Sequence, residues 1–446
     1  MTDGSDFQLT ISQNKFLAEG SGEVEAIVTV EASQPEPAVR TVPSVRTSGQ
    51  TPHPSRTGAQ AAEVIILDTS ASMEWPITKI VAARQAAMKA VDTLRDGVRF
   101  AVVAGSHVAT MVYPRDKDMA IADGRTKIEA KAAIGGLAPS GGTAMGSWLR
   151  LADELLSAHP KAIKHAILLT DGKNEHESPE EFGANIKSVT GSFVCDCRGI
   201  GTDWEPDELR RVASATLGSV DIVPDPSGLE ADFRAMMANA MGKAVADVSL
   251  RVWVPQGAQI RFVRQVLPTV EDLTFKGSEA GPQAYDFPTG AWGTERRDYH
   301  IGVDVPGRPV GQELRAAWVR LVIPGDDPQF LASGNVLAEW TDDESAYAKI
   351  DPNVAHYTGQ QELAAVIQEG LQAKKVGDLD TATTRLGRAV ALASQTGNEA
   401  TAALLDKVVD VVDVGSGTVR LKKTVEKVDE MSLDTRSTRT VRTRKE

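Results

Sequence analysis

The sequence predicts a doubly wound α/β domain with a mostly parallel sheet, joined to an antiparallel β-sandwich domain and a C-terminal helical region. Three patterns lead to this fold class. Apolar strand-like runs alternate with helical segments from Ala62 to about Ala244. After residue 245 hydrophobic residues recur at every second position, and over residues 359–412 they recur at helical spacing. Alternating strands and helices build parallel sheets, whereas period-two alternation indicates antiparallel strands.

The chain has 446 residues, more than one hydrophobic core usually serves, so we expect about three domains. The predicted segments are 1–32 for N-terminal strands that join the β-sandwich, 33–60 for a disordered linker, 61–243 for the α/β domain, 244–346 for the β-sandwich, 356–413 for a helical hairpin-like region and 414–446 for a flexible, basic tail rich in Thr and Arg. The linker carries five prolines and almost no large apolar side chains, so it cannot bury enough surface to offset the entropy of ordering.

Each element of the α/β domain follows from its own pattern. Val64–Leu67 is an apolar strand, and Pro76 suits the first turn of a helix that ends near Leu94. Further strands are predicted at 98–104, 108–113, 166–170, 193–199 and 220–223, and further helices at 127–134, 144–158, 179–188, 206–215 and 229–242. In such sheets a functional site is expected beyond the carboxyl ends of the strands, where the strand order reverses.

The flanking regions follow different periods. Alternate apolar positions in 248–254, 299–305 and 314–323 predict antiparallel strands, with Gly and Pro in the connections. Leu363, Ile367 and Leu371 lie on one face of a predicted helix, and residues 375–382 resemble the turn of a tetratricopeptide helical hairpin. One such hairpin cannot bury its own apolar face, so we expect it to pack on the β-sandwich or on a partner.

Three short motifs place oxygen-bearing side chains where strands end. Residues 68–72 read Asp-Thr-Ser-Ala-Ser directly after the first apolar strand. Residues 140–143 read Ser-Gly-Gly-Thr before a predicted helix, and residues 170–172 read Thr-Asp-Gly at the end of a second apolar strand. Carboxylate and hydroxyl oxygens suit a small hard cation such as Mg²⁺ or Mn²⁺ better than Zn²⁺.

These motifs, in this order, resemble the metal-ion-dependent adhesion site of the von Willebrand factor A family, and the resemblance covers residues 61–243. It implies a site that holds Mg²⁺ (or Mn²⁺) through five residues: Asp68, Ser70, Ser72, Thr143 and Asp171. The two serines offer hydroxyls directly to the cation, the first aspartate neutralises it and holds coordinated waters, and the threonine reaches in from its own loop. Because neutral hydroxyls leave the ion short of negative charge, a partner protein that presents an acidic residue completes the coordination.

A simpler interpretation of the first motif stays open. Asp and Ser are good helix-capping residues, so Asp68, Ser70 and Ser72 could serve only to start the following helix. Asp203, which follows the next predicted strand, either lines the partner-binding rim or caps a helix.

The resemblance implies a non-enzymatic, metal-dependent protein-interaction scaffold, in intracellular signalling with kinases or forkhead-associated proteins. No Gly-x-Ser-x-Gly or His-Glu-x-x-His motif points to catalysis. Two alternatives stay open. One is an accessory subunit that couples an AAA+ ATPase to its substrate. The other is a structural module, similar in architecture to vesicle coat proteins, with a vestigial metal site.

Charge and cysteine content restrict the setting. The formal net charge of −13 disfavours nucleic acid or an anionic membrane as the main partner, because both need a cationic surface. No signal-peptide pattern and no apolar run of membrane-spanning length occurs. Cys195 and Cys197 do not form a disulfide framework, and small buried hydrophobes are their expected role. We therefore expect a cytoplasmic protein.

The predicted tail offers phosphorylation candidates. Thr435, Thr438 and Thr440 alternate with arginines in a polar strip, and phosphate would add about two negative charges and strong acceptors. A phosphothreonine reader, such as a forkhead-associated domain, would then bind the tail. The alternative is a basic solubilising tail without a partner.

Overall fold

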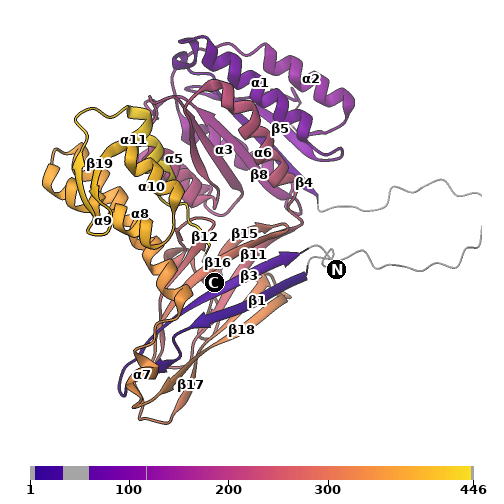
Figure 1. Cartoon of the computed structure of the whole chain (residues 1–446). Coiled ribbons are helices and arrows are strands. Elements are labelled where there is room, and N and C mark those ends of the chain that lie inside the picture. Colours follow the sequence, from indigo (N-terminus) through magenta and orange to yellow (C-terminus); the bar gives the residue numbers. More distant parts are fainter. Residues whose placement is uncertain (1–5, 34–59, 117, 443–446) are drawn as a thin grey trace, which may run out of the picture.

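The computed structural model describes residues 6–33, 60–116 and 118–442, and it confirms the predicted fold class. Figure 1 shows the α/β domain above the β-sandwich, with the C-terminal helices lying beside both. Apart from its two end residues, the segment predicted as a disordered linker, 33–60, lies outside the described residues. In the described part of the chain, no helix is both long enough and apolar enough to cross a bilayer.

The α/β domain is built on one mixed sheet with the strand order β10-β9-β8-β4-β5-β6, and β7 pairs with β5. Its strands are β4 (Ala61–Asp68), β5 (Arg99–Gly105), β6 (Ala109–Tyr113), β7 (Ala120–Ile121), β8 (Ile163–Thr170), β9 (Val194–Ile200) and β10 (Val220–Val223). β6 and β7 run antiparallel to β5, whereas the other neighbours pair in parallel. The chain moves from β4 to β5 on one side and later to β8 on the other, so the strand order reverses beside β4.

Helices cover both faces of this sheet. They are α1 (Thr78–Thr93), α2 (Gly124–Gly135), α3 (Met145–Ser157), α4 (Pro179–Ser188), α5 (Pro206–Ala215) and α6 (Leu229–Met241), with short 3₁₀ turns η1 (Ala71–Glu74) and η2 (Pro226–Gly228). Ile65 and Leu67 of β4 pack with α1, α2 and α6, while Val64 and Ile66 pack with α3, α4 and α5. The continuous apolar run of β4 is thereby buried on both faces, as the sequence pattern requires.

The second domain is a β-sandwich of two sheets that share one core. One sheet has the order β1-β3-β16-β12-β13: β1 (Asp6–Gln13), β3 (Glu23–Ser33), β16 (Glu295–Asp304), β12 (Gln259–Leu267) and β13 (Glu271–Asp272). The other has the order β14-β15-β11-β17-β18-β2: β14 (Ser278–Gly281), β15 (Ala284–Trp292), β11 (Val245–Trp253), β17 (Glu313–Ile323), β18 (Gln329–Trp340) and β2 (Phe16–Leu17). A 3₁₀ turn, η3 (Thr274–Lys276), follows β13. Since β3 pairs with β16, the α/β domain is an insertion between parts of the sandwich.

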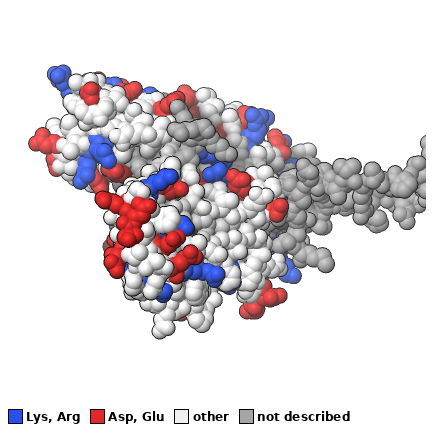
Figure 2. Space-filling model, turned by 60° about the horizontal axis from the view of Figure 1, so that its bottom comes forward, with Lys and Arg blue, Asp and Glu red and all other residues white. Residues whose placement is uncertain are grey.

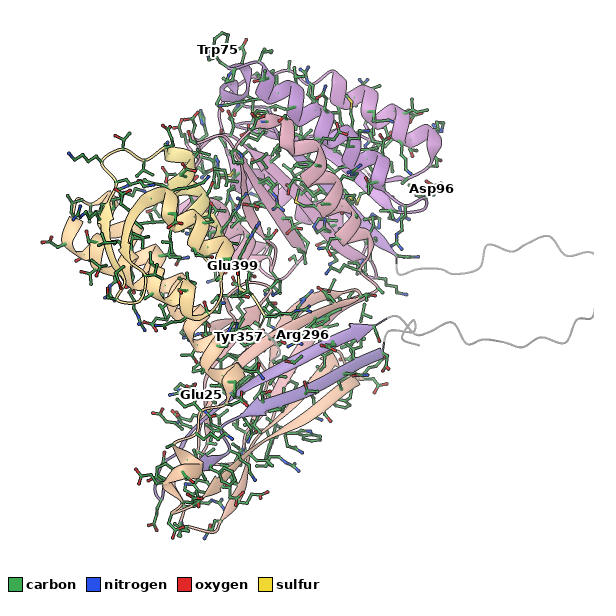
Figure 3. All side chains as sticks on the ribbon, in the orientation of Figure 1. Glu25, Trp75, Asp96, Arg296, Tyr357 and Glu399 are labelled. Atoms are coloured by element: carbon green, nitrogen blue, oxygen red, sulfur yellow. The ribbon has the colours of Figure 1, made fainter. Side chains whose placement is uncertain are left out.

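The C-terminal region combines helices with a small hairpin. Its elements are α7 (Glu344–Tyr347), α8 (Pro352–Lys375), α9 (Leu379–Gln395), α10 (Glu399–Val408), β19 (Val409–Asp413), β20 (Thr418–Leu421) and α11 (Lys427–Arg436). α8 packs on the β-sandwich through Val354 and Tyr357, which lie in one apolar cluster with Ile27. Figure 3 shows Tyr357 and Arg296 near each other at this junction, where both side chains bind Asp298.

The prediction of a flexible tail over 414–446 is wrong for its described residues. α11 buries Met431 and Leu433 despite the polar composition of the segment. Arg436 Nε lies 2.8 Å from Oδ1 of Asp221 in β10, and Arg210 Nη2 of α5 lies 2.6 Å from Oδ1 of Asp434. Arginines that composition assigns to a solvated tail are instead partners of carboxylates on the α/β domain. The described part of the segment therefore fixes the helical region to that domain.

Acidic and basic side chains are distributed over the surface without strong segregation on the face that Figure 2 shows. Lysine and arginine side chains lie among aspartates and glutamates on this face, so the face presents no broad surface of one charge.

Candidate metal site

Asp68 is the last residue of β4 and is held by two hydrogen bonds. The backbone N–H of Ser70 donates to Oδ1 at 2.7 Å, and the hydroxyl of Thr170, at the end of β8, donates to Oδ2 at 2.5 Å. The side chain is fully buried. Burial raises the pKa of Asp68 to about 6, against the opposing effect of these hydrogen bonds. Burial therefore disfavours the charged form of this carboxyl group, and a cation beside it would favour that form.

The loop that carries Thr143 packs against the turn that follows β4, and backbone hydrogen bonds join the two. The N–H of Ser140 donates to the Thr69 carbonyl at 2.6 Å, and the N–H of Ala71 donates to the Gly141 carbonyl at 2.9 Å. Gly141 has φ of +74°, and a Cβ at this position would lie 2.1 Å from Nδ1 of His107. Only glycine fits both the backbone angle and the space. This close approach brings Thr143 to the strand ends.

Asp171 is completely buried and both of its carboxylate oxygens are engaged. The hydroxyl of Ser72 donates to Oδ1 at 2.7 Å, and Nζ of Lys79, in the first turn of α1, donates to Oδ2 at 2.6 Å. Burial by itself lowers the pKa of Lys79, but the hydrogen bond and charge contact with Asp171 outweigh it and raise that pKa above its usual value. Lys79 is therefore a permanent cation at the edge of the site.

The oxygens of the three motifs converge on one point. A Cβ added to Gly172 would lie 3.2 Å from Oγ1 of Thr143, 3.3 Å from Oγ of Ser72 and 4.0 Å from Oδ2 of Asp68. Ser70 joins the group, because its Oγ lies 2.9 Å from Oγ of Ser72. All five residues predicted as metal ligands are thus brought together at the carboxyl edge of the sheet. Whether they bind a metal stays a prediction.

The donor set fits a small hard cation. Adjacent oxygens around an octahedral Mg²⁺ at 2.0–2.1 Å are separated by about 2.9 Å, and the two serine hydroxyls already have this spacing. Within the described residues, no group of three or more His, Cys, Asp or Glu is placed to hold a metal. A cation at this site would therefore depend on the hydroxyls as much as on Asp68, and hydroxyl and carboxylate oxygens favour Mg²⁺ or Mn²⁺.

The rim of the site carries side chains suited to contact a partner. Trp75 follows directly after η1, the turn that carries Ser72, and its side chain is 83% exposed. Figure 3 shows Trp75 at the outer end of the α/β domain, far from the β-sandwich. Asp203, which the sequence left as rim or cap, has a side chain 69% exposed and lies 3.5 Å from Nζ of Lys79. Isolated exposed apolar residues are ordinary, but a tryptophan beside the candidate metal site is a candidate contact for a partner protein.

Two residues of the site were missed in the sequence. Thr170 is the last residue of β8, and β8 ends at the same edge of the sheet as β4. This placement was the available signal that its hydroxyl bonds to Asp68 at the end of β4. Lys79 begins a stripe of buried residues on α1 that continues with Ala83, Ala86 and Ala90. A lysine on the buried face of a helix needs an acidic partner, and this rule was the available signal.

Of the predicted phosphorylation sites, Thr435 is buried in this structure, whereas Thr438 and Thr440 are partly exposed. Thr435 is 3% exposed and its hydroxyl donates to the Met431 carbonyl. The hydroxyl of Thr440 donates to the Val266 carbonyl at 2.7 Å, and the Thr438 carbonyl accepts from the N–H of Val270. Thr438 and Thr440 join the segment after α11 to the β-sandwich, whereas Thr435 is bonded within α11, and a phosphothreonine reader is not supported at this folded segment.

Comparisons with known proteins match two parts of the chain to family models. The model for the von Willebrand factor type A domain matches residues 62–222, and the model for the von Willebrand factor type A C-terminal domain matches residues 391–437. The second match covers α10, the β19–β20 hairpin and α11. Domains of the first type are protein-interaction modules rather than enzymes as a class.

Individual relatives extend the similarity to the whole chain. A solved structure, von Willebrand factor type A from Catenulispora acidiphila, is 47% identical, with 99% of this chain and 98% of that chain covered and a TM-score of 0.91. The ArnB paralog VWA2 from Sulfolobus acidocaldarius is 15% identical over 98% of both chains, with a TM-score of 0.54, and shares the fold. An uncharacterized protein of Synechocystis sp. is 27% identical over 222 residues, which are 48% of this chain and about half (51%) of that relative. The near-complete match to the Catenulispora structure shows that the chain belongs to the von Willebrand factor type A family.

Proposed function

We propose that this protein is a non-enzymatic interaction scaffold that binds a partner carboxylate through a divalent cation. The observation that carries the proposal is the convergence of Asp68, Ser70, Ser72, Thr143 and Asp171 at one edge of the sheet. Mg²⁺ or Mn²⁺ is the proposed ion, and it would supply a Lewis-acidic position for a carboxylate oxygen. These five residues would hold the ion and direct their hydroxyl and carboxylate oxygens toward it.

The charge balance of the site supports an acidic partner. Among the described residues, the carboxylates of the five predicted ligands are Asp68 and Asp171, and Nζ of Lys79 already pairs with Asp171 at 2.6 Å. A divalent ion would therefore keep excess positive charge, and a carboxylate from a partner would remove it at little cost in desolvation of the protein's own groups. The exposed Trp75 beside the site offers apolar contact area to the residues that flank that carboxylate.

The setting of the scaffold remains part of the proposal. A cytoplasmic role in kinase or forkhead-associated signalling is the first candidate, as the family resemblance implies. Coupling to an AAA+ ATPase is the second candidate. The third is a coat-like assembly that does not depend on the metal. Each candidate predicts a different set of bound proteins, so one experiment separates them.

The experiment is an affinity capture from native lysate with Mg²⁺ or with EDTA, using the wild type and Asp68→Ala. The proposal predicts a protein that is retained only by the wild type in Mg²⁺, and its identity decides between signalling and ATPase coupling. The variant must keep its circular dichroism spectrum, because loss of the fold would also remove the partner. Partners that ignore both EDTA and the substitution would contradict a metal-dependent scaffold.

A further inference from the structure

Lys79 is the one charged side chain on the buried stripe of α1, and it lies at the candidate metal site. Its side chain is 9% exposed, and its Nζ lies 2.6 Å from Oδ2 of Asp171 and 3.5 Å from Oδ2 of Asp203. Asp203 is mostly exposed, so within the described part of the chain Asp171 is the only buried carboxylate that the ammonium contacts. A cation held this tightly beside a cation site must affect the binding of a metal ion.

We propose that Lys79 is a built-in counter-cation of the metal site, which lowers its affinity for the ion and keeps the bound ion electrophilic toward a partner carboxylate. The inference rests on the proposed function. It assigns a role to a residue outside the five predicted ligands. Lys79 acts through Asp171 and is therefore a positioning and charge-setting residue.

The charges of the site give the direction of the effect. Among the buried groups, a divalent ion with Asp68 and Asp171 alone would be formally neutral, whereas the ammonium of Lys79 leaves one net positive charge. Asp203 is 69% exposed, so water screens its charge. Repulsion between the ammonium and the ion weakens metal binding, because both lie in a region shielded from water. The same excess charge attracts an anionic partner. In the metal-free protein, Lys79 compensates the buried Asp171, which would otherwise be an unpaired charge.

The opposite role is also physically possible, and the test must separate the two. If Lys79 only oriented Asp171 so that the carboxylate could hold Ser72, its removal would weaken metal binding. Substitutions next to a metal's ligands commonly change its affinity by about 10–100-fold. The sign of the change therefore distinguishes a counter-cation from an orienting residue.

The experiment measures Mn²⁺ binding to the full chain by electron paramagnetic resonance of the free ion. Lys79→Met keeps the length of the side chain and removes its charge. The proposal predicts that Lys79→Met binds Mn²⁺ about tenfold or more tightly than the wild type. It also predicts that the variant melts at a lower temperature than the wild type in EDTA. Added Mg²⁺ should raise the melting temperature of the variant more than that of the wild type. Lys89→Met is the matched control, because Lys89 lies on the same helix with a side chain that is 47% exposed, and it is expected to bind Mn²⁺ as the wild type does.

A second variant guards against loss of the fold in Lys79→Met. The double substitution Lys79→Met with Asp171→Asn removes the buried pair without leaving a lone charge, and the asparagine oxygen can still accept from Ser72. The proposal predicts Mn²⁺ affinity within about threefold of the wild type for the double variant and at least tenfold weaker binding for Asp171→Asn alone. Equal or weaker binding by Lys79→Met, with normal binding by the wild type, would overturn the inference and leave the proposed function intact. Absence of Mn²⁺ binding in the wild type would overturn both.

Discussion

The hydroxyl of Ser72 donates a hydrogen bond of 2.7 Å to Oδ1 of Asp171, and this bond joins two motifs that lie 99 residues apart in the chain. The parallel pairing of β4 with β8 makes it possible, because Leu67 and Leu169 lie opposite each other in the sheet. The carboxyl ends of the two strands therefore coincide. Short polar motifs become a site because the topology places their strand ends at one edge.

Substitution of Asp68 by Asn should stabilise the metal-free protein at neutral and higher pH. The raised pKa of about 6 means that the folded state holds its proton more tightly than the unfolded state, whose value is about 4. This contribution to stability is complete below about pH 4 and is lost as the pH rises through about 6. In EDTA at pH 8, Asp68→Asn should therefore be more stable than the wild type by about 3 kcal/mol.

Chemical denaturation of both proteins at pH 4 and pH 8 checks this expectation. The difference between them should shrink toward pH 4, where Asp68 is protonated in the folded state and about half protonated in the unfolded state. A stability difference that does not depend on pH would contradict the assigned burial effect. Asp123→Asn provides a contrast, because that carboxylate caps α2 at the surface and its pKa is lowered by the hydrogen bonds from Thr126.

Substitution of Gly172 by Ala should damage the site more than the fold. The added methyl would lie 3.2 Å from Oγ1 of Thr143 and 3.3 Å from Oγ of Ser72, so both hydroxyls would have to move. Such crowding in a packed interior lowers the free energy of unfolding by about 1–3 kcal/mol. Calorimetric titration with Mg²⁺ should show a strong loss of affinity for the ion. Gly124→Ala is the matched control, because nothing lies within 4 Å of its added Cβ. Unchanged Mg²⁺ affinity in Gly172→Ala would mean that the point of convergence is not where the ion binds.

Substitution of Trp75 by Ala should reduce the affinity for a metal-dependent partner and leave Mn²⁺ binding unchanged. The side chain is 83% exposed and supports no core packing, while truncation of a central interface tryptophan typically costs about 2 kcal/mol or more. Surface plasmon resonance with the captured partner measures the effect, and electron paramagnetic resonance checks the metal. Phe275, 96% exposed on the β-sandwich, is the control position for an exposed aromatic far from the site. Equal losses from Phe275→Ala and Trp75→Ala would argue against docking on the metal face.

Substitution of Arg436 by Met should loosen α11 from the α/β domain. Arg436 and Arg439 both pair with Asp221, whose pKa is lowered by them although its burial acts in the opposite direction. Arg436 is the less exposed of the two arginines, and its loss should lower the free energy of unfolding by about 1–2 kcal/mol. Hydrogen exchange should show faster exchange in α11 and little change in β4 or β8. Uniform protection in the wild type and the variant would mean that apolar burial of Met431 and Leu433 alone holds the helix.

Much of the fold and the five residues of the candidate site were predictable, whereas the charge partners were not. Apolar strands that end in Asp68 and Asp171 specify both the sheet and the edge where the site lies. The buried stripe of α1 indicates that Lys79 needs an acidic partner, but the identity of that partner depends on how α1 packs over β4, which no local pattern encodes. The prediction of a flexible tail over 414–446 is wrong for a related reason. Composition predicts that its charged residues are solvated, yet Arg436 pairs with Asp221, and Asp434 pairs with Arg210 of α5. Only the tertiary structure reveals these long-range partners.

A titration of the wild type with Mn²⁺, repeated with Asp68→Ala, tests the central claim most directly. Free Mn²⁺ is measured by electron paramagnetic resonance, with Mg²⁺ as competitor and EDTA to reverse binding. The account predicts one Mn²⁺ per wild-type chain, displaced by Mg²⁺, and no saturable binding by a folded Asp68→Ala variant. Equal binding by the two proteins, or none by the wild type, would contradict the claim that the oxygens gathered around Asp68 form a metal site.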